Sequence, residues 1–103
     1  MSYDVSIHYK DSDHCLWWRN HTSSTSGMWR LAGCNLADYH GWTTDDVLPL
    51  VSGAINEMQR MPDTYRQLEP TNGWGTFEST VEFLQDIESA CKLFTGEKVS
   101  VWT

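Results

Sequence analysis

One amphipathic stripe near the C-terminus constrains the fold of this chain more than any other feature. Its apolar residues recur at steps of three and four positions, which places them on one face of an α-helix. They are Phe77, Val81, Leu84, Ile87, Cys91 and Phe94. Asn72-Gly73 before the stripe is typical of a turn, and either Gly75 or Thr76 can serve as the N-cap. Gly96 can end the helix in the left-handed conformation. The sequence therefore predicts one long helix with a broad apolar face.

A second amphipathic helix is predicted in the middle of the chain. Thr44, Asp45 and Asp46 supply capping oxygens and negative charge at its start, and Pro49 requires that the first turn be close by. Its apolar stripe comprises Val47, Val51, Ala54, Ile55 and Met58. Met61-Pro62 ends this helix, because the residue before proline disfavours the α region. Residues 62–68 are expected to form one further helical turn.

Strand patterns occupy the two ends of the chain. Residues from Tyr3 to Tyr9 alternate between apolar and polar, which predicts a half-buried strand. After a turn at residues 11–13, Cys15 to Arg19 is expected to return as a second strand, and Glu97 to Trp102 as a third. The fold class is therefore α+β: a single domain over residues 1–103, with a small antiparallel sheet packed against two amphipathic helices and a short helix.

The segments between these elements are predicted to be loops with one short helix. Residues 20–27 contain His, Thr, Ser and Gly without apolar periodicity, so a polar loop is expected. Ser26 can cap a short helix that carries residues 28–32 and stops at Gly33. Residues 34–42 show no regular pattern and are expected to form another loop.

Charge and cysteine content narrow the partners and the compartment. The net charge of -7 argues against nonspecific binding to nucleic acid or to an anionic membrane, since both need Lys and Arg. Cys15, Cys34 and Cys91 form no Cys-x-x-Cys pair, so free thiols in a reducing cytosol are expected. No signal peptide or membrane-spanning run is recognised, and we expect a cytoplasmic protein. Among its six tryptophans, Trp102 and parts of the Trp17-Trp18 pair are expected to be buried in a homo-oligomer.

Three motifs resemble a group of small proteins seen in bacteriophages and in bacterial genomes. They are an Asn-x-Thr sequence before Met28-Trp29-Arg30, the run from Met61 to Leu68, and Asn-Gly-Trp-Gly-x-Phe-Glu from Asn72 to Glu78. The resemblance spans nearly the whole chain and implies a phage or mobile-element origin with an intracellular setting. It implies no particular chemistry. Relatives commonly carry a second Asn after the Asn-x-Thr sequence, whereas this chain has Thr25 or Ser26 there.

Ten residues in two segments are the candidates for a binding site. They combine amide, hydroxyl, charged and aromatic side chains, a mixture with which small-molecule pockets orient their ligands. They are Asn20, His21, Thr22, Thr25, Met28, Trp29 and Arg30 in the first segment, and Asn72, Trp74 and Glu78 in the second.

These side chains favour a ligand that resembles a nucleotide. Arg30 offers a planar fork for phosphate or carboxylate, and the rings of Trp29 and Trp74 can stack on a base. The N-terminus of the long helix can present free N–H groups to an anion. In the alternative interpretation, Trp29 and Trp74 belong to the core, the asparagines satisfy loop backbone, and Arg30 pairs with Glu78.

We expect no catalytic residues, no metal site and no cofactor. His14, Cys15 and His21 lack a fourth ligand at a recognisable spacing for zinc. Cys34 and His40 could form a nucleophilic pair only with an orienting group and an oxyanion donor, and the sequence indicates neither.

Two classes of function follow. In the first, the chain is a small phage accessory protein that binds and sequesters a small ligand, such as a nucleotide-derived signal of host defence, without turnover. In the second, it inhibits a host defence enzyme by docking exposed tryptophans and the acidic helix face of Glu78, Glu82 and Asp86. Such an acidic stripe is also typical of a solvated face. A hydrolase with Glu78 or His21 as general base is a third, weaker alternative.

Overall fold

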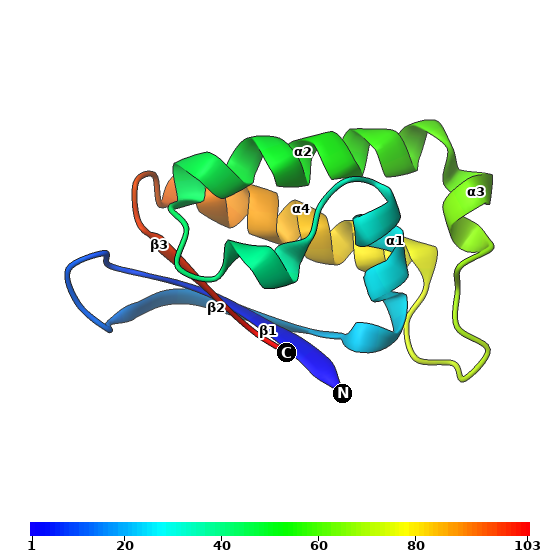
Figure 1. Cartoon of the computed structure of the whole chain (residues 1–103), viewed down its shortest axis with the longest axis horizontal. Helices are drawn as coiled ribbons and strands as arrows, with labels where there is room; N and C mark the ends of the chain where they lie inside the picture. The colour runs from blue at the N-terminus through cyan, green and yellow to red at the C-terminus, as the bar shows by residue number, and fades with distance from the viewer.

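The computed structural model describes residues 1–103 and shows a three-stranded antiparallel sheet with its helices on one side (Figure 1). The strand order is β2-β1-β3, so the N-terminal strand is the central one. The elements are β1 (Ser2–His8), β2 (Cys15–Thr22), the 3-10 turn η1 (Ser23–Thr25), α1 (Ser26–Leu31), the 3-10 turn η2 (Leu36–Tyr39), α2 (Thr44–Arg60), α3 (Pro62–Arg66), α4 (Phe77–Leu93) and β3 (Lys98–Trp102). The predicted α+β class is confirmed.

The core lies between the sheet and the two long helices. Tyr3, Val5 and Ile7 alternate along β1 and are all buried, because successive residues of a strand point to opposite faces. Helices α2 and α4 run side by side above them (Figure 1) and contribute their apolar stripes. The opposite face of the sheet has no covering layer, and both Trp18 and Trp102 are exposed there.

The ends of the long helices follow the predicted capping chemistry with small differences. Of the two predicted N-caps of α4, the structure uses Thr76, whose Oγ1 accepts a hydrogen bond from the Ser79 N–H at 3.0 Å. Ser79 Oγ accepts in return from the Thr76 N–H, which completes a capping box. Helix α2 is capped by Thr43, one residue before the predicted start.

The predicted polar loop at residues 20–27 is wrong. Strand β2 continues through Thr22, residues 23–25 form η1, and α1 begins at Ser26, with Thr25 and not the predicted Ser26 at the N-cap position. The pairing with β1 explains the extension, since Asp4 lies opposite Asn20 and Tyr3 opposite His21. A partner strand distant in sequence therefore stabilises an extended backbone that local composition does not favour. The predicted loop at residues 34–42 likewise contains the short turn η2.

Candidate functional site

Parts of the two candidate segments meet at one end of the sheet. The loop that precedes α4 lies beside the connection from β2 to α1, and Asn72 Nδ2 donates to Ser24 Oγ at 3.4 Å. Between them is a pocket of about 340 Å³. Its lining residues are Met1, Thr22, Ser24, Asn72 and Trp74. The fold thus brings Thr22 from the first segment together with Asn72 and Trp74 from the second.

Trp74 is held at this pocket by a tight turn. Its N–H donates to Asn72 Oδ1 at 2.8 Å, and the flanking residues Gly73 and Gly75 have φ of +78° and +96°. Only glycine adopts such angles without strain. Trp74 is 67% exposed, so it is not a core residue. An ordered backbone therefore presents a large aromatic surface to solvent next to hydroxyl and amide groups.

Gly75 packs the turn closely against Thr22 and Thr25 of the first candidate segment. A Cβ atom at this position would lie 2.8 Å from Thr22 Cγ2 and 2.8 Å from Thr25 Cγ2. The backbone of the turn therefore packs directly on two threonine methyl groups, at a distance that no other residue permits. This contact fixes the position of Trp74 relative to Thr22.

A buried polar cluster lies beneath this contact. His21 Nε2 hydrogen-bonds with Thr25 Oγ1 at 3.1 Å and approaches Thr80 Oγ1 at 3.4 Å. The imidazole stacks on Phe83 with a centroid distance of 4.8 Å, and the Thr80 hydroxyl donates to the Thr76 carbonyl at 2.7 Å. These residues support the pocket from below and are not accessible to a ligand.

Burial lowers the pKa of His21, and the neighbouring Arg19 lowers it further. The folded state therefore favours the neutral imidazole, whereas the unfolded chain protonates it near the ordinary pKa of about 6.5. Below that pH the unfolded state binds more protons than the folded state, so the stability associated with neutral His21 is present above about pH 6.5 and is lost as the pH falls towards the lowered pKa.

Replacing His21 with glutamine is expected to flatten the acid side of the stability profile. The wild-type free energy of unfolding should fall below about pH 6.5, with a slope from this residue of at most about 1.4 kcal/mol per pH unit. Urea denaturation at a series of pH values measures this slope. The exposed His14→Gln variant is the control and should keep the wild-type profile. An unchanged slope in His21→Gln would show that His21 does not couple folding to pH.

Met28 and Trp29 have a structural role. Both are fully buried in the core, and the Trp29 ring lies edge-on against Tyr3 with a centroid distance of 5.0 Å. The Trp29 Nε1 atom is buried without a hydrogen-bond partner. The predicted stacking of Trp29 on a ligand is therefore wrong, and the core interpretation of this residue is correct.

The expected anion site at the start of α4 is also wrong. The Phe77 N–H donates to Glu69 Oε1 at 2.7 Å, so a carboxylate of the chain itself occupies that position. Arg30 is exposed and its Nη2 donates to Ser26 Oγ at 2.9 Å, outside the set of residues that line the pocket. The alternative pairing of Arg30 with Glu78 is not formed either, because Glu78 pairs with Arg66 at 2.9 Å.

The acidic stripe on α4 is largely neutralised within the chain. Glu78 pairs with Arg66, and Asp86 pairs with Arg19 from β2. Only Glu82 among the three stripe residues makes no ion pair. The surface that the inhibitor hypothesis requires is therefore much less negative than the sequence indicates.

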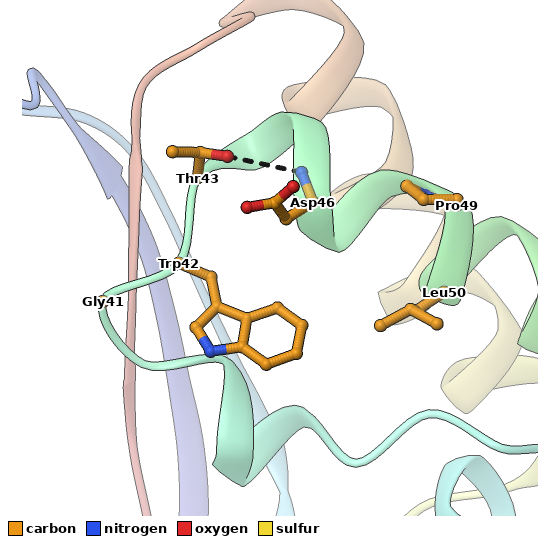
Figure 2. A pocket seen from close by; sticks show the side chains of 6 residues that line it. All are labelled: Gly41, Trp42, Thr43, Asp46, Pro49 and Leu50. Atoms are coloured by element: carbon orange, nitrogen blue, oxygen red, sulfur yellow. Dashed lines mark hydrogen bonds between the residues drawn. The ribbon is translucent and has the colours of Figure 1, made fainter.

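The largest pocket lies elsewhere, at the start of α2 (Figure 2). It has a volume of about 570 Å³ and is lined by Gly41, Trp42, Thr43, Asp46, Pro49 and Leu50. The Trp42 indole forms one wall, with Leu50 across from it and the Thr43 cap above (Figure 2). Sequence reasoning missed this pocket because residues 34–42 have no periodicity. The tryptophan directly before a capping threonine was the available indication.

The fold does not bring together the predicted nucleophilic pair or a group of metal ligands. Burial raises the pKa of the Cys34 thiol to about 12 and that of Cys91 to about 11, so both stay protonated at neutral pH. His40 Nδ1 accepts the Val101 N–H at 3.1 Å instead of activating Cys34. No group of three His, Cys, Asp or Glu side chains is placed to hold a metal ion.

No helix combines the length and apolar composition that a membrane crossing requires.

Comparisons of the chain with protein-family models, with curated proteins and with solved structures find no match. The function is therefore inferred from the side chains that the fold brings together.

Proposed function

We propose that this chain binds and sequesters a small ligand with a planar aromatic ring, such as a nucleobase, in the pocket beside Trp74. The observation that carries the proposal is the exposed indole of Trp74, held by its turn next to the hydroxyl and amide groups of Thr22, Ser24 and Asn72. The indole supplies a stacking surface for the ring. The neighbouring polar groups supply donors and acceptors for its edge.

The polar and aromatic side chains of the pocket, those of Thr22, Ser24, Asn72 and Trp74, favour binding over turnover. Hydroxyl, amide and indole groups do not titrate near neutral pH, so these side chains offer hydrogen bonds but no general acid or base. A ligand that enters can be oriented and held there. Sequestration needs no more than this.

The same lining narrows the ligand class. No Lys or Arg side chain is among the lining residues, whereas sites that grip phosphate use such cations or free helix N–H groups. A nucleotide-derived signal of host defence fits the pocket if its base stacks on Trp74 and its phosphates extend into solvent. A nucleoside or a free heterocycle fits it equally well.

Trp74→Ala is expected to weaken ligand binding by about 5- to 150-fold while leaving the fold intact. The side chain is mostly exposed, so its removal deletes the stacking surface, worth about 1–3 kcal/mol per base, with little loss of core packing. Native mass spectrometry of protein purified from cells should show a bound small molecule in the wild type and a clean apo mass in the variant. Denaturation followed by mass analysis then identifies what is released.

Trp42→Ala is the matched control, because Trp42 is also a partly exposed tryptophan beside a pocket. We expect it to retain the ligand. Loss of the ligand in Trp42→Ala but not in Trp74→Ala would place binding at the start of α2 and contradict the proposal. An apo mass for the wild type, repeated after incubation with cell extract, would also contradict it.

A further inference from the structure

The two edges of the sheet differ in whether their outward main-chain groups are hydrogen-bonded. At the β3 edge, the Val99 N–H donates to the Trp42 carbonyl at 2.7 Å, and the Gly41 N–H donates to the Val99 carbonyl at 2.8 Å. His40 accepts the next outward N–H, that of Val101. The segment before α2 thus satisfies the edge of β3. Strand β2 has no such cover and a single strand neighbour, β1.

The hydrogen-bond register identifies the open groups on β2. The Ser23 N–H donates to the Met1 carbonyl, and in an antiparallel pair the residues that bond across the ladder alternate with those that face away. Tyr3 and His21 lie two residues further along β1 and β2, and therefore form the next bonded pair. The main-chain N–H and C=O groups of Trp18, Asn20 and Thr22 consequently face the open edge. A row of donors and acceptors in this arrangement is complementary to another extended strand.

A groove beside this edge extends the contact surface. It has a volume of about 210 Å³ between β2 and α4. The groove is lined by Trp17, Asp86, Ser89, Ala90, Leu93 and Phe94. Leu93 is 74% exposed at its rim. A strand added to β2 would place alternate side chains over this groove and cover its apolar lining.

The edge is electrically neutral in a chain of net charge -7. Arg19 is the charged residue within β2, and its ion pair with Asp86 already compensates it. The open positions Trp18, Asn20 and Thr22 carry no charge. Two copies can therefore approach along β2 without placing like charges opposite one another, which is the condition that self-pairing of an acidic protein must meet.

We propose that β2 pairs antiparallel with β2 of a second copy across a two-fold axis, so that the sheet continues through a homodimer. A two-fold axis presents the same open groups from both sides, so each copy satisfies the edge of the other. The apolar groove on each copy is covered by the incoming strand. The occupant is thus a second copy of this chain.

Trp18→Pro tests the proposal by blocking the open edge. The Trp18 N–H faces away from β1, so proline removes a bond at the interface and none within the sheet. We expect wild-type protein to be dimeric in sedimentation equilibrium, and the dissociation constant of the variant to rise by about tenfold or more. Trp102→Lys is the control, because Trp102 has a similar exposure, 62%, on the same face but lies on β3. It should leave the dimer intact.

Three results would overturn the proposal. The first is a wild-type protein that is monomeric at all concentrations, and the second is a dimer that survives in folded Trp18→Pro. The third is loss of the dimer in both variants, because that result would place the interface on the open face of the sheet. Cysteine cross-linking covers the case in which Trp18→Pro does not fold. In a Cys15→Ser background, mixtures of single cysteines at positions 18, 20 and 22 should form disulfides only between positions with one constant sum, as antiparallel pairing requires. Absence of every cross-link, or a parallel pattern, contradicts it.

Discussion

Replacing Gly75 with alanine is expected to lower the free energy of unfolding by about 2–4 kcal/mol. Two costs add at this position. The φ of +96° is strained for any residue with a Cβ, and that atom would lie 2.8 Å from methyl carbons of Thr22 and Thr25. The threonines cannot move away freely, because Thr25 is buried and hydrogen-bonded to His21. Urea denaturation of the purified variant measures the loss.

Gly73→Ala separates the two costs. Gly73 also has a positive φ, +78°, but a Cβ there would meet no atom within 4 Å. Only the backbone strain applies, so a loss of about 1–2 kcal/mol is expected. Equal losses in the two variants would show that the close approach of Gly75 to the threonines does not contribute. The turn would then not be locked against β2 as described.

Phe83→Ala is expected to cost about 3–5 kcal/mol, the range for removing a buried phenylalanine. Phe83 is fully buried in the middle of α4, where its ring stacks on His21 and lies 5.6 Å from the Trp29 ring. Its loss would leave a cavity beneath the pocket. It would also let water reach His21, so the pKa of that imidazole should rise towards its ordinary value.

Gln85→Ala is the control on the same helix. Gln85 is exposed and lines none of the pockets, and its truncation should change the free energy of unfolding by no more than about 0.5 kcal/mol. Chemical denaturation gives the stabilities, and NMR titration of the His21 ring gives its pKa. A small cost for Phe83→Ala, with an unchanged His21 pKa, would contradict the packing of the polar cluster against α4.

Local patterns were sufficient to predict most of the fold. The apolar residues of α4 recur every three or four positions, and Tyr3, Val5 and Ile7 alternate with polar residues. Each pattern shows that one face of the element is buried, and it can be recognised without knowing which element packs against that face. Capping residues then set the helix ends within a residue or two. These elements lie where expected because local preference and burial agree in them.

The misplaced elements depend on contacts distant in sequence. Asn20 and Thr22 have no apolar pattern, yet they belong to β2 because β1 pairs with them and their face of the sheet is open. His21 points inward and is buried against Phe83, an unusual choice for a core position. Strand pairing, and not composition, therefore decides the structure of this segment.

The candidate site could be predicted only in part for the same reason. Asn72 and Trp74 lie in a turn whose chemistry is local, and both line the pocket. The partner of Glu78 and the cap on the Phe77 N–H come from Arg66 and Glu69. No spacing rule links these residues to the start of α4, because the intervening loop brings them back to it. The ion pair and the hydrogen bond at the start of α4 therefore could not be predicted from the sequence.

The most direct test of ligand binding beside Trp74 is the indole N–H region of the NMR spectrum during titration with nucleosides. The Trp74 resonance can be assigned from its absence in Trp74→Phe. We predict that the Trp74 signal shifts with saturation, whereas those of buried Trp29 and of Trp42 at the other pocket stay in place. A shift confined to Trp42, or no shift with any nucleoside and with no compound released from the purified protein, would contradict the proposed function.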